Sequence, residues 1–239
     1  MPVLLIAGGS RGIGAATAKM AAARGYDVAV NYVSNAKAAD DVVAAVKAAG
    51  RKAVALQGDM AVEADIERVF DEAAKALGPI THFVHSAGIV GKNSRLDAAT
   101  ADNIRAVLDI NLFGALPAVR RMSTAIGGHG GAIVLLSSIS SVVGGANEYI
   151  CYAAAKGGVD ALTNGLARET AKEGVRINAV RPGPIDTEIH DPGRLERVAP
   201  LVPVGRAGTA DEVAEPILFL LSDAASYITG ALLNVTGGR

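Results

Sequence analysis

The sequence predicts an α/β protein built on one doubly wound parallel sheet, with helices on both faces. Short apolar segments alternate along the 239 residues with longer alanine-rich stretches of helical periodicity. Most of these apolar segments lack polar alternation, as expected for strands buried on both faces, and strand–helix–strand alternation implies parallel pairing. Neither a long polar linker nor a repeat of fixed period divides the chain, so we expect one domain over residues 1–239.

Seven apolar segments are predicted to be the strands, and six stretches between them the helices. The strands are expected at Val3–Ala7, Asp27–Tyr32, Ala53–Gln57, Thr81–Ser86, Ala132–Ser137, Arg176–Arg181 and Leu232–Val235. The helices are expected at Gly12–Arg24, Ala36–Ala49, Glu63–Leu77, Thr100–Ala125, Ala153–Lys172 and Ala210–Leu221.

Glycine, proline and capping residues indicate where the helices end. Gly50 follows the second helix as a C-terminal glycine, and Gly78-Pro79 stops the third. Pro117 predicts either a kink in the fourth helical stretch or a junction of two helices. Thr209, followed three residues later by a glutamate, predicts a capping box at the start of the last helix.

Composition excludes several classes of function. The 23 basic and 24 acidic residues leave a net charge of −1, so no basic nucleic-acid footprint is visible. One cysteine excludes an internal disulfide framework and a cysteine-built metal site. The four histidines lack ligand spacing, since His82 and His85 lie in a predicted buried strand, so no metal is expected. Without a basic leader or an apolar run of about 18 residues, we expect a cytoplasmic protein that does not bind membranes.

A glycine-rich loop follows the first predicted strand. It reads Gly8-Gly9-Ser10-Arg11-Gly12-Ile13-Gly14 and opens a predicted helix. Glycines let the backbone turn tightly and approach a pyrophosphate, while the helix N-terminus presents amides and a positive dipole to it. The loop therefore predicts a dinucleotide site, and a glycine-rich turn without a ligand is the alternative.

The end of the second strand favours NADP over NAD. NAD-binding proteins usually place an acid there for the ribose hydroxyls, whereas this chain reads Asn31-Tyr32-Val33-Ser34. Arg11 is expected to pair with a 2′-phosphate, with added hydrogen bonds from Asn31 and Ser34. The alternative for Arg11 is a solvated loop residue.

Two further segments follow predicted strands, at the edge where ligands bind in open α/β sheets. They are Gly58-Asp59-Met60 and Ser86-Ala87-Gly88-Ile89. Asp59, Met60, Ala87 and Gly88 are accordingly candidate cofactor contacts. Asp59 is expected either to accept a hydrogen bond from an adenine amino group or to cap a helix.

Tyr152 and Lys156 predict an acid–base centre, because residues four apart lie on one face of a helix. A free tyrosine has a pKa near 10, too high for a base at neutral pH. An ammonium about 4 Å away contributes roughly 4 kcal/mol, enough to lower that pKa by roughly three units before desolvation opposes it. Ser138, which follows the fifth strand, is placed to donate to a carbonyl oxygen as negative charge develops. A surface Tyr–Lys pair is the alternative.

Taken together, these motifs resemble the short-chain dehydrogenase/reductase family over essentially the whole chain. The matching segments, in order, are Gly8–Gly14, Asp59, Ala87-Gly88, Asn111, Ser138, Tyr152-x-x-x-Lys156, Arg181-Pro182-Gly183 with Thr187, Tyr227–Gly230 and Gly237-Gly238. The resemblance implies a Rossmann fold and direct hydride transfer between a nicotinamide and carbon. It also implies the homotetramer that is common in the family.

The resemblance assigns roles to single residues. Tyr152 would be the catalytic acid/base, Lys156 would lower its pKa and bind the nicotinamide ribose, and Ser138 would orient the substrate. Asn111 would hold a water in a proton relay to Lys156. The segment Pro182-Gly183 would approach the cofactor, and Ile185 and Thr187 would meet the nicotinamide carboxamide.

The chain departs from the family pattern at three places. Ala7 stands where a threonine is common, and His85-Ser86 replaces the usual Asn-Asn before Ala-Gly. Ser138 precedes Tyr152 by one residue more than the commonest spacing. None of these departures removes a catalytic residue.

Substrate contacts are implied in residues 183–209, a proline-rich stretch predicted to be either a lid or a mobile loop. Its mixed charges give no clear preference for an anionic acyl carrier. Glu148 is either an acceptor for a polyol or a solvated loop acid. The resemblance extends to bacterial sugar-dehydrogenase-like and 3-oxoacyl-reductase-like members, so we expect a sugar, polyol or small carbonyl substrate, with a 3-oxoacyl thioester as the alternative. A non-catalytic NADP(H) sensor is the alternative from another class.

Overall fold

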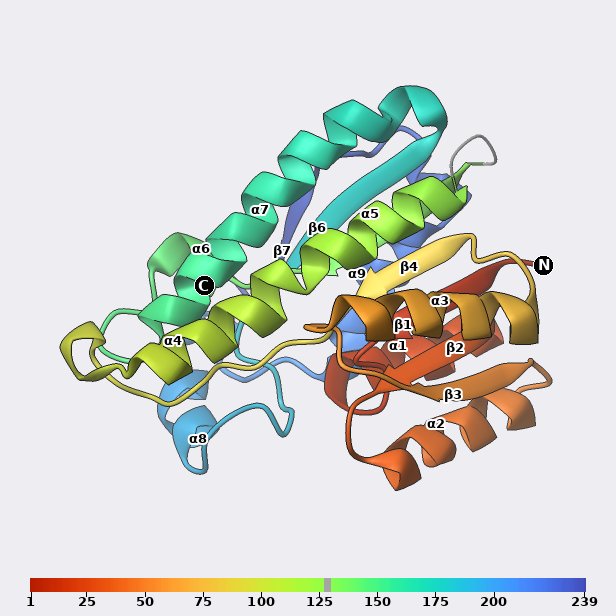
Figure 1. Ribbon diagram of the computed structural model, residues 1–239. Coiled ribbons are helices and arrows are strands. Elements are labelled where there is room, and N and C mark those ends of the chain that lie inside the picture. Colours follow the sequence, from red (N-terminus) through yellow and green to blue (C-terminus); the bar gives the residue numbers. More distant parts are fainter. Residues whose placement is uncertain (127–129) are drawn as a thin grey trace.

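The computed structural model describes residues 1–126 and 130–239, and the strands of the chain form one parallel sheet (Figure 1). The strand order is β3-β2-β1-β4-β5-β6-β7. The strands are β1 Val3–Ala7, β2 Asp27–Tyr32, β3 Ala53–Gln57, β4 His82–His85, β5 Gly131–Leu136, β6 Val175–Pro182 and β7 Leu232–Val235. Strands β1 and β4 pair at the centre, where the order of succession reverses. The predicted doubly wound parallel sheet is confirmed.

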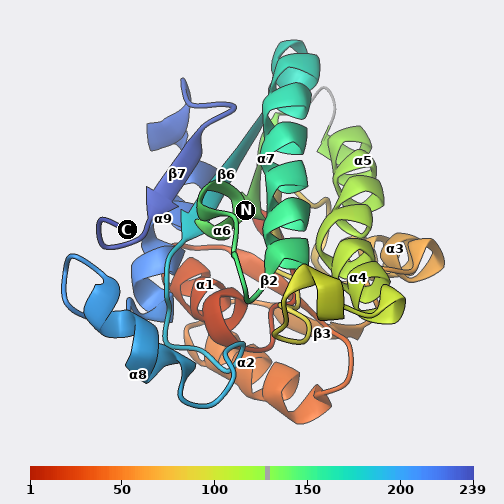
Figure 2. The ribbon, with the colours of Figure 1, turned by 90° about the vertical axis from the view of Figure 1, so that its left-hand side faces the viewer.

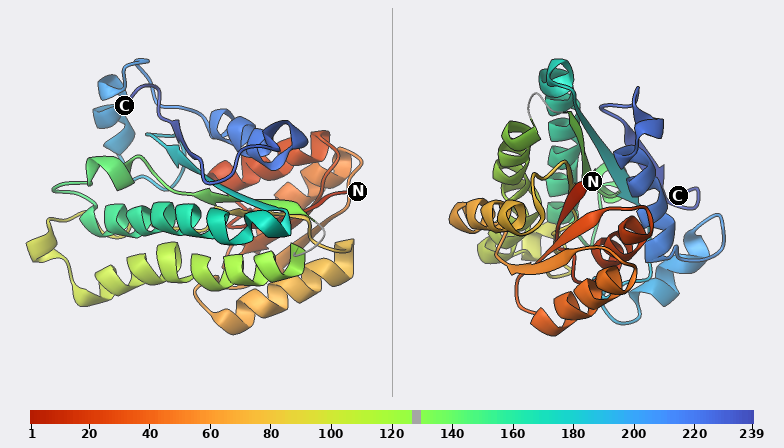
Figure 3. Two further views of the ribbon diagram at one scale, coloured as in Figure 1. Left: turned by 90° about the horizontal axis from the view of Figure 1, so that it is seen from above. Right: turned by 90° about the vertical axis from the view of Figure 1, so that its right-hand side faces the viewer.

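Helices cover both faces of the sheet, as the coloured ribbons of Figure 3 show from above and from the side. One face carries α1 Gly12–Ala23, α2 Ala36–Ala48 and α9 Ala210–Leu221. The other carries α3 Glu63–Leu77, α5 Ala115–Ile126 and α7 Ile150–Thr170, with α4 Ala101–Leu108 beside α7. Two shorter helices, α6 Ser140–Val143 and α8 Arg194–Val198, lie beyond the strand ends. Short 3-10 turns occur at Leu96–Ala98, Ala171–Glu173, Ala199–Leu201 and Asp223–Ala225.

The strand pleat divides the core into two layers. Leu4 and Ile6 of β1 pack toward α1 and α9, whereas Leu5 between them packs toward α3 and α5. Both layers are apolar, because successive side chains of a strand point to opposite faces of the sheet. The continuous apolar runs of the sequence therefore reflect a sheet that is covered on both sides.

Most element bounds agree with the sequence prediction. Four strands and two helices begin and end at the predicted residues, and β4, β5 and β6 differ by one residue at each end. The capping box is present, since the Thr209 hydroxyl accepts from the Glu212 amide and the Glu212 carboxylate accepts from the Thr209 amide. Helix α7 begins at Ile150, three residues before the predicted start, so Tyr152 lies in its first turn.

The long helical stretch 100–125 is divided by a π-helical turn, Asp109–Phe113, so the predicted junction of two helices is present and lies a few residues before Pro117. Pro117 itself lies in the first turn of α5, where a missing amide costs no helical hydrogen bond. Gly114 follows the π-turn, and a Cβ there would lie 2.4 Å from the carbonyl oxygen of Met60. The close approach of two backbones requires glycine at this position.

The proline-rich stretch after β6 is folded over the sheet edge. Ile185 and Gly208 form an isolated parallel bridge that closes the base of the stretch, and α8 lies within it. Within residues 1–126 and 130–239, no helix combines the length and the apolarity needed to cross a membrane.

Candidate active site

The predicted site residues gather at the carboxyl-terminal edge of the sheet, which faces the viewer in Figure 2. The glycine loop follows β1, Asp59 follows β3, Gly88 follows β4 and Ser138 follows β5. Parallel strands end side by side, so these segments form one rim. Helices α6 and α8 and the first turn of α7 lie around the same edge (Figure 2).

The glycine loop has no room for side chains at its turns. Gly8 has φ 72° and Gly12 has φ 50°, a region that favours glycine. A Cβ on Gly14 would lie 2.3 Å from the carbonyl oxygen of Gly8, and one on Gly8 would lie 2.8 Å from the backbone of Ala87. Because α1 starts at Gly12, the free amides of its first turn face this cradle. The loop therefore fits a dinucleotide pyrophosphate.

From the sequence, Asn31 is expected to donate a hydrogen bond to a 2′-phosphate. The structure contradicts this expectation, because the Asn31 side chain is buried and its polar atoms are already paired. The residue is 1% exposed. Its Oδ1 accepts from the Gly8 amide at 3.2 Å, and its Nδ2 donates to the Gly58 carbonyl at 2.9 Å. Asn31 thus ties the glycine loop to the end of β3 and has a structural role.

Arg11 is exposed at the rim and reaches across to the segment after β6. Its guanidinium forms an ion pair with Glu188 at 3.3 Å. Thr187 lies against the loop as well, since a Cβ on Gly12 would come within 3.3 Å of the Thr187 methyl. Thr187 therefore lies beside the phosphate cradle. Ser10 and Ile13 of the loop are half-buried, and Ile13 packs against the core.

The segment Pro182-Gly183 and Ile185 are positioned by backbone contacts. The Gly183 amide donates to the Val235 carbonyl at 2.9 Å, which fixes the turn after β6 against the end of β7. The Ile185 side chain packs into the core, and its carbonyl contacts His190 Nε2 at 2.9 Å. A contact of Ile185 with a carboxamide would therefore have to use its backbone.

Asp59 and Met60 lie in the turn between β3 and α3. The Asp59 carboxylate accepts from the Ala61 amide at 2.9 Å, which fixes this turn. It does not cap α3, whose N-cap residue is Val62 without a side-chain hydrogen bond, and the contact of Asp59 with adenine stays a prediction. Met60 is 2% exposed and packs among the core residues under α3. A contact of Met60 with a cofactor would therefore have to use its backbone.

Tyr152, Lys156 and Ser138 are brought together where α7 crosses the end of β5. Lys156 is 3% exposed, and its ammonium donates to the Leu136 carbonyl at 2.6 Å. The same ammonium lies 5.6 Å from the centre of the Tyr152 ring. Ser138 Oγ accepts from the Ser140 amide at 3.1 Å, which fixes the hydroxyl and leaves its proton free to be donated.

Burial dominates the electrostatics of this group. It raises the pKa of Tyr152, while the Ser138 hydroxyl and the charge of Arg194 lower it less strongly. Burial also lowers the pKa of Lys156 to about 8, against the opposing effect of Asp160. From the sequence, Lys156 is expected to lower the pKa of Tyr152. In the structure desolvation outweighs the effects of nearby charges, and among these the charge of Arg194 lowers the pKa of Tyr152.

Asn111 is buried in the π-turn and faces the same group. Its Nδ2 donates to the carbonyls of Ile89 and Val107, both at 2.8 Å. A Cβ on Gly88 would lie 2.6 Å from Asn111 Oδ1 and 3.6 Å from Lys156 Nζ. The π-turn therefore places the amide beside the lysine, as the resemblance implied.

Comparison with known proteins decides the family. A family model described as Enoyl-(Acyl carrier protein) reductase matches residues 7–239. A short chain dehydrogenase from Burkholderia cenocepacia J2315, solved in complex with NADP, has a TM-score of 0.95 and 35% identity over 99% of this chain and 97% of that one. This chain belongs to the short-chain dehydrogenase/reductase family.

The relatives of this short-chain dehydrogenase/reductase align with nearly its whole length. The chain is 44% identical to the uncharacterized oxidoreductase YgfF of Escherichia coli K12, over 100% of both chains. It is 39% identical to an L-rhamnose 1-dehydrogenase (NAD(P)(+)) of Sphingomonas, over 98% of this chain and 94% of the relative. A 3-oxoacyl-[acyl-carrier-protein] reductase of Synechocystis is 37% identical, over 99% and 96%. The chain is therefore an oxidoreductase that acts on an alcohol or carbonyl group, in a family that typically uses NAD(P).

A polar cluster that the sequence does not predict lies between α8 and the segment before α7. Arg194 of α8 lies 5.1 Å from the centre of the Tyr149 ring, and the Tyr149 hydroxyl donates to Asp191 at 2.6 Å. Glu148 forms ion pairs with Arg194 and Arg197, so it is not a freely solvated acid. The sequence placed these residues in two separate segments, and only their tertiary contacts reveal the cluster.

The histidines give no metal site in the described part of the chain. No group of three potential ligands from His, Cys, Asp and Glu lies together among residues 1–126 and 130–239. His82 and His85 both lie in β4, where burial lowers the pKa of His82 to about 4. His129 lies outside the described residues.

Proposed function

We propose that this short-chain dehydrogenase/reductase interconverts a secondary alcohol and a ketone with NADP(H), with Tyr152 as the acid/base. The observation that carries the proposal is the convergence of Tyr152, Lys156 and Ser138 beside the glycine cradle. Because burial raises the pKa of Tyr152, the phenol holds a proton at neutral pH and is ready to donate it.

Each side chain of the site has a separate role in the transfer of one proton between Tyr152 and the substrate oxygen. Bound NADP(H) supplies the hydride carrier. During reduction Tyr152 donates its proton to the carbonyl oxygen, while the Ser138 hydroxyl donates a hydrogen bond to the same oxygen as negative charge develops. During oxidation Tyr152 takes the proton of the alcohol, and the positive charges of Lys156 and Arg194 stabilise the phenolate.

The proposed cofactor is NADP rather than NAD. No acid follows β2 within Asn31–Ser34, and Arg11 is exposed at the rim of the cradle. The Burkholderia neighbour was solved with NADP, and the rhamnose enzyme is named for both cofactors. We expect Arg11→Gln to lower kcat/KM for NADP about tenfold or more, with little effect on NAD. An equal loss with both cofactors would contradict the preference, and Arg168→Gln, on the exposed face of α7, is the control.

The proposed substrate is a sugar, a polyol or another small carbonyl compound. The likeness to L-rhamnose 1-dehydrogenase supports it, as does the balance of Arg194 and Arg197 against Glu148 and Asp191 in the polar cluster. Such balanced charges suit an uncharged, hydroxyl-rich molecule. A 3-oxoacyl thioester is the second candidate, supported by the Synechocystis relative. Comparing kcat/KM for rhamnose and other sugars with that for a 3-oxoacyl thioester separates the two.

A panel assay of nicotinamide absorbance tests the function. We expect turnover with NADP on sugars, polyols or secondary alcohols, and a loss of roughly 100-fold or more in Tyr152→Phe. Tyr26→Phe is the matched control, because Tyr26 directly precedes β2 and so lies at the edge of the sheet opposite the site. Turnover that survives in Tyr152→Phe would overturn the acid/base assignment. Tight NADPH binding with no turnover across the panel would favour the non-catalytic sensor.

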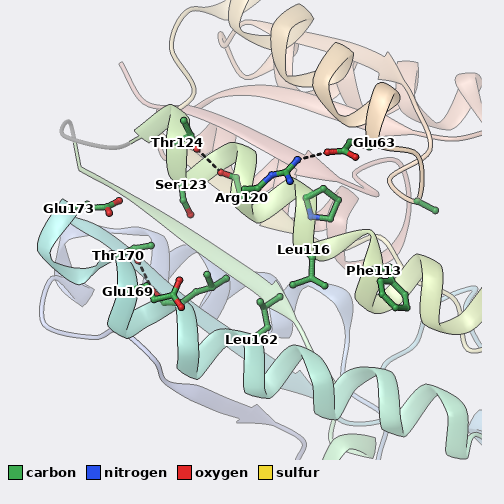
Figure 4. A pocket seen from close by; sticks show the side chains of 13 residues that line it. Glu63, Phe113, Leu116, Arg120, Ser123, Thr124, Leu162, Glu169, Thr170 and Glu173 are labelled. Carbon is green, nitrogen blue, oxygen red and sulfur yellow. Dashed lines mark hydrogen bonds and ion pairs between the residues drawn. The ribbon is translucent and has the colours of Figure 1, made fainter.

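We propose further that the enzyme is a homotetramer with two kinds of interface. One surface is an open groove of about 770 Å³ between α5 and α7, seen from close by in Figure 4. Its lining includes the apolar side chains of Phe113, Leu116 and Leu162, together with charged residues such as Glu63 and Glu169 (Figure 4). Because a two-fold interface uses the same patch on both copies, this groove would pair two chains.

The second surface lies at the β7 edge of the sheet. Three large side chains are exposed there: Phe219 of α9, Tyr227 in the connection after α9, and Leu233 of β7. Two different two-fold patches on one chain generate a tetramer. We expect a tetramer in native mass spectrometry and a dimer for Leu116→Glu. A wild-type monomer, or a tetramer that Leu116→Glu leaves intact, would contradict this assembly.

The proposed unit is one catalytic domain over residues 1–239, with residues 183–209 as the segment that contacts substrate. Arg194 and His190 within this segment lie near Tyr149 and the acid–base group, which supports the assignment. The cytoplasmic location expected from the sequence stays a prediction.

A further inference from the structure

A buried histidine lies beside the proposed acid–base centre, at the position where the family pattern has asparagine. His85 is the last residue of β4 and is 2% exposed. Phe83, two residues earlier, packs into the core under α5, so the alternation of the strand directs His85 to that same face. The two rings lie 6.1 Å apart, edge to face. Within the described residues, His85 Nε2 is buried without a hydrogen-bond partner.

A second buried acceptor without a partner lies nearby. Asn111 Oδ1 is buried and makes no hydrogen bond among the described residues, although both hydrogens of the same amide are used. Unpaired buried acceptors are uncommon in folded proteins, since each costs about 1–3 kcal/mol of desolvation. Two such atoms beside one lysine therefore need an explanation.

Lys156 offers the donors that these acceptors lack. An ammonium carries three N–H groups, and one of them is donated to the Leu136 carbonyl. A single point, the Cβ position of Gly88, lies 2.6 Å from Asn111 Oδ1 and 3.6 Å from Lys156 Nζ. His85 pairs with Leu135 across β4 and β5, one residue before the Leu136 carbonyl that Lys156 binds, so its ring lies on the side of β5 that Lys156 reaches.

We propose that His85 is a positioning residue for Lys156: the buried water that the family resemblance places between Asn111 and Lys156 also binds His85 Nε2. The water accepts one N–H from Lys156 and donates its two hydrogens to the two acceptors. Three polar partners are the usual number for a buried water. The arrangement holds the ammonium on the β4 side of α7 and stabilises its charged form. This inference rests on the proposed function only where Lys156 acts in catalysis.

The arrangement needs a neutral His85 imidazole and a charged Lys156 ammonium. Burial and the Lys156 charge lower the pKa of His85 to about 3, so the imidazole is neutral and Nε2 is available as an acceptor. The groups around Lys156 are His85 on β4, Tyr152 and Asp160 on α7, and the neutral Asn111 of the π-turn. Asp160 raises the pKa of Lys156 and is itself paired with Arg181 of β6. The pKa of Lys156 is about 8, so the loss of one acceptor would increase the neutral fraction of Lys156 at pH values close to 8.

Kinetics of two variants test the positioning role. His85→Leu removes the acceptor, whereas His85→Asn keeps a side-chain oxygen. We expect His85→Leu to lower kcat about tenfold and to move the alkaline fall of kcat to lower pH, because the Lys156 ammonium loses support. His85→Asn should recover most of the rate and the pH profile. An unchanged profile in His85→Leu, or an equal loss in both variants, would overturn the proposal.

Nitrogen NMR tests the contact without any turnover. In protein labelled with ¹⁵N-histidine, the Nε2 resonance of His85 should show an unprotonated nitrogen that accepts a hydrogen bond, and Lys156→Met should move it toward a free lone pair. The His82 resonances serve as the internal control, since His82 bonds to Thr81 instead. If Lys156→Met leaves the His85 resonance in place, the proposed contact is absent, whatever the enzyme turns over. If the resonance moves and no substrate is found, the contact stands and the catalytic assignment fails.

Discussion

Arg181 of β6 donates two hydrogen bonds to one carboxylate oxygen of Asp160 of α7, at 3.1 and 2.8 Å. Both side chains are largely buried. Asp160 lies one helical turn after Lys156, and Arg181 immediately precedes the segment Pro182-Gly183. This pair therefore fixes α7, which carries Tyr152 and Lys156, to the strand that leads into residues 183–209.

Breaking this pair should cost much more stability than breaking a surface pair. Asp160→Asn leaves the Arg181 guanidinium buried without its counter-charge, so we expect a loss of about 3 kcal/mol in the free energy of unfolding. Urea denaturation measures it. Asp41→Asn is the control, because it breaks the exposed pair with Lys37 on α2 and should change stability by less than about 1 kcal/mol. Equal effects of the two substitutions would contradict the structural role of Asp160.

The glycine cradle gives a second prediction. A Cβ on Gly14 would meet the Gly8 carbonyl oxygen at 2.3 Å, so Gly14→Ala must displace the loop. We expect NADPH binding to weaken roughly 100-fold, about 2.7 kcal/mol, in a fluorescence titration. Gly165→Ala is the matched control within α7, because a Cβ there meets no atom within 4 Å. That control should bind NADPH normally and gain about 1 kcal/mol of stability from better helix propensity.

The sequence predicts the sheet well because the strands are apolar on both faces. The strands Val3–Ala7 and Asp27–Tyr32 can be predicted from local sequence alone. A short run of apolar side chains bounded by turn residues indicates a buried strand in an α/β chain. The glycine loop is equally local, because its conformation follows from the positions of its glycines. The candidate acid–base residues follow from their four-residue spacing and the family pattern.

The sequence predicts less well the direction in which side chains point. Asn31 continues the alternation of Ala29 in β2 and is therefore buried beneath the rim, where it binds the glycine loop. Met60 follows a strand but turns into the core. The π-turn around Asn111 depends on the contact of Gly114 with the Met60 carbonyl, which joins two distant segments. The approach of Arg194 to Tyr152 likewise exists only once the substrate segment has folded over the edge.

Arg194 should set the pH dependence of alcohol oxidation. Its charge lowers the pKa of Tyr152, and the base form of Tyr152 is the one that takes the alcohol proton. Arg194→Met removes that charge, so the pKa of Tyr152 rises and the acidic limb of the rate profile moves to higher pH. The rate below the limb falls, and the rate on the plateau is retained. Arg197→Met, which also loses an ion pair with Glu148, is the control and should leave the limb in place.

His85 should make the protein less stable as the pH falls. Its folded-state pKa is about 3, against an ordinary value of 6.5. Between these pH values His85 binds a proton in the unfolded chain but not in the folded chain. The contribution of His85 to the free energy of unfolding is therefore fully present above pH 6.5 and is lost as the pH falls. The slope from one such group approaches about 1.4 kcal/mol per pH unit.

The difference between wild type and His85→Asn isolates this contribution, because the carboxylates and the other histidines are common to both. We expect urea denaturation to show the stability of the wild type falling more steeply than that of the variant between pH 6 and 4. His82, whose pKa is about 4, adds a similar slope to both proteins and cancels in the comparison. Parallel curves for the two proteins would mean that His85 titrates alike in the folded and unfolded chains, which its burial in β4 forbids.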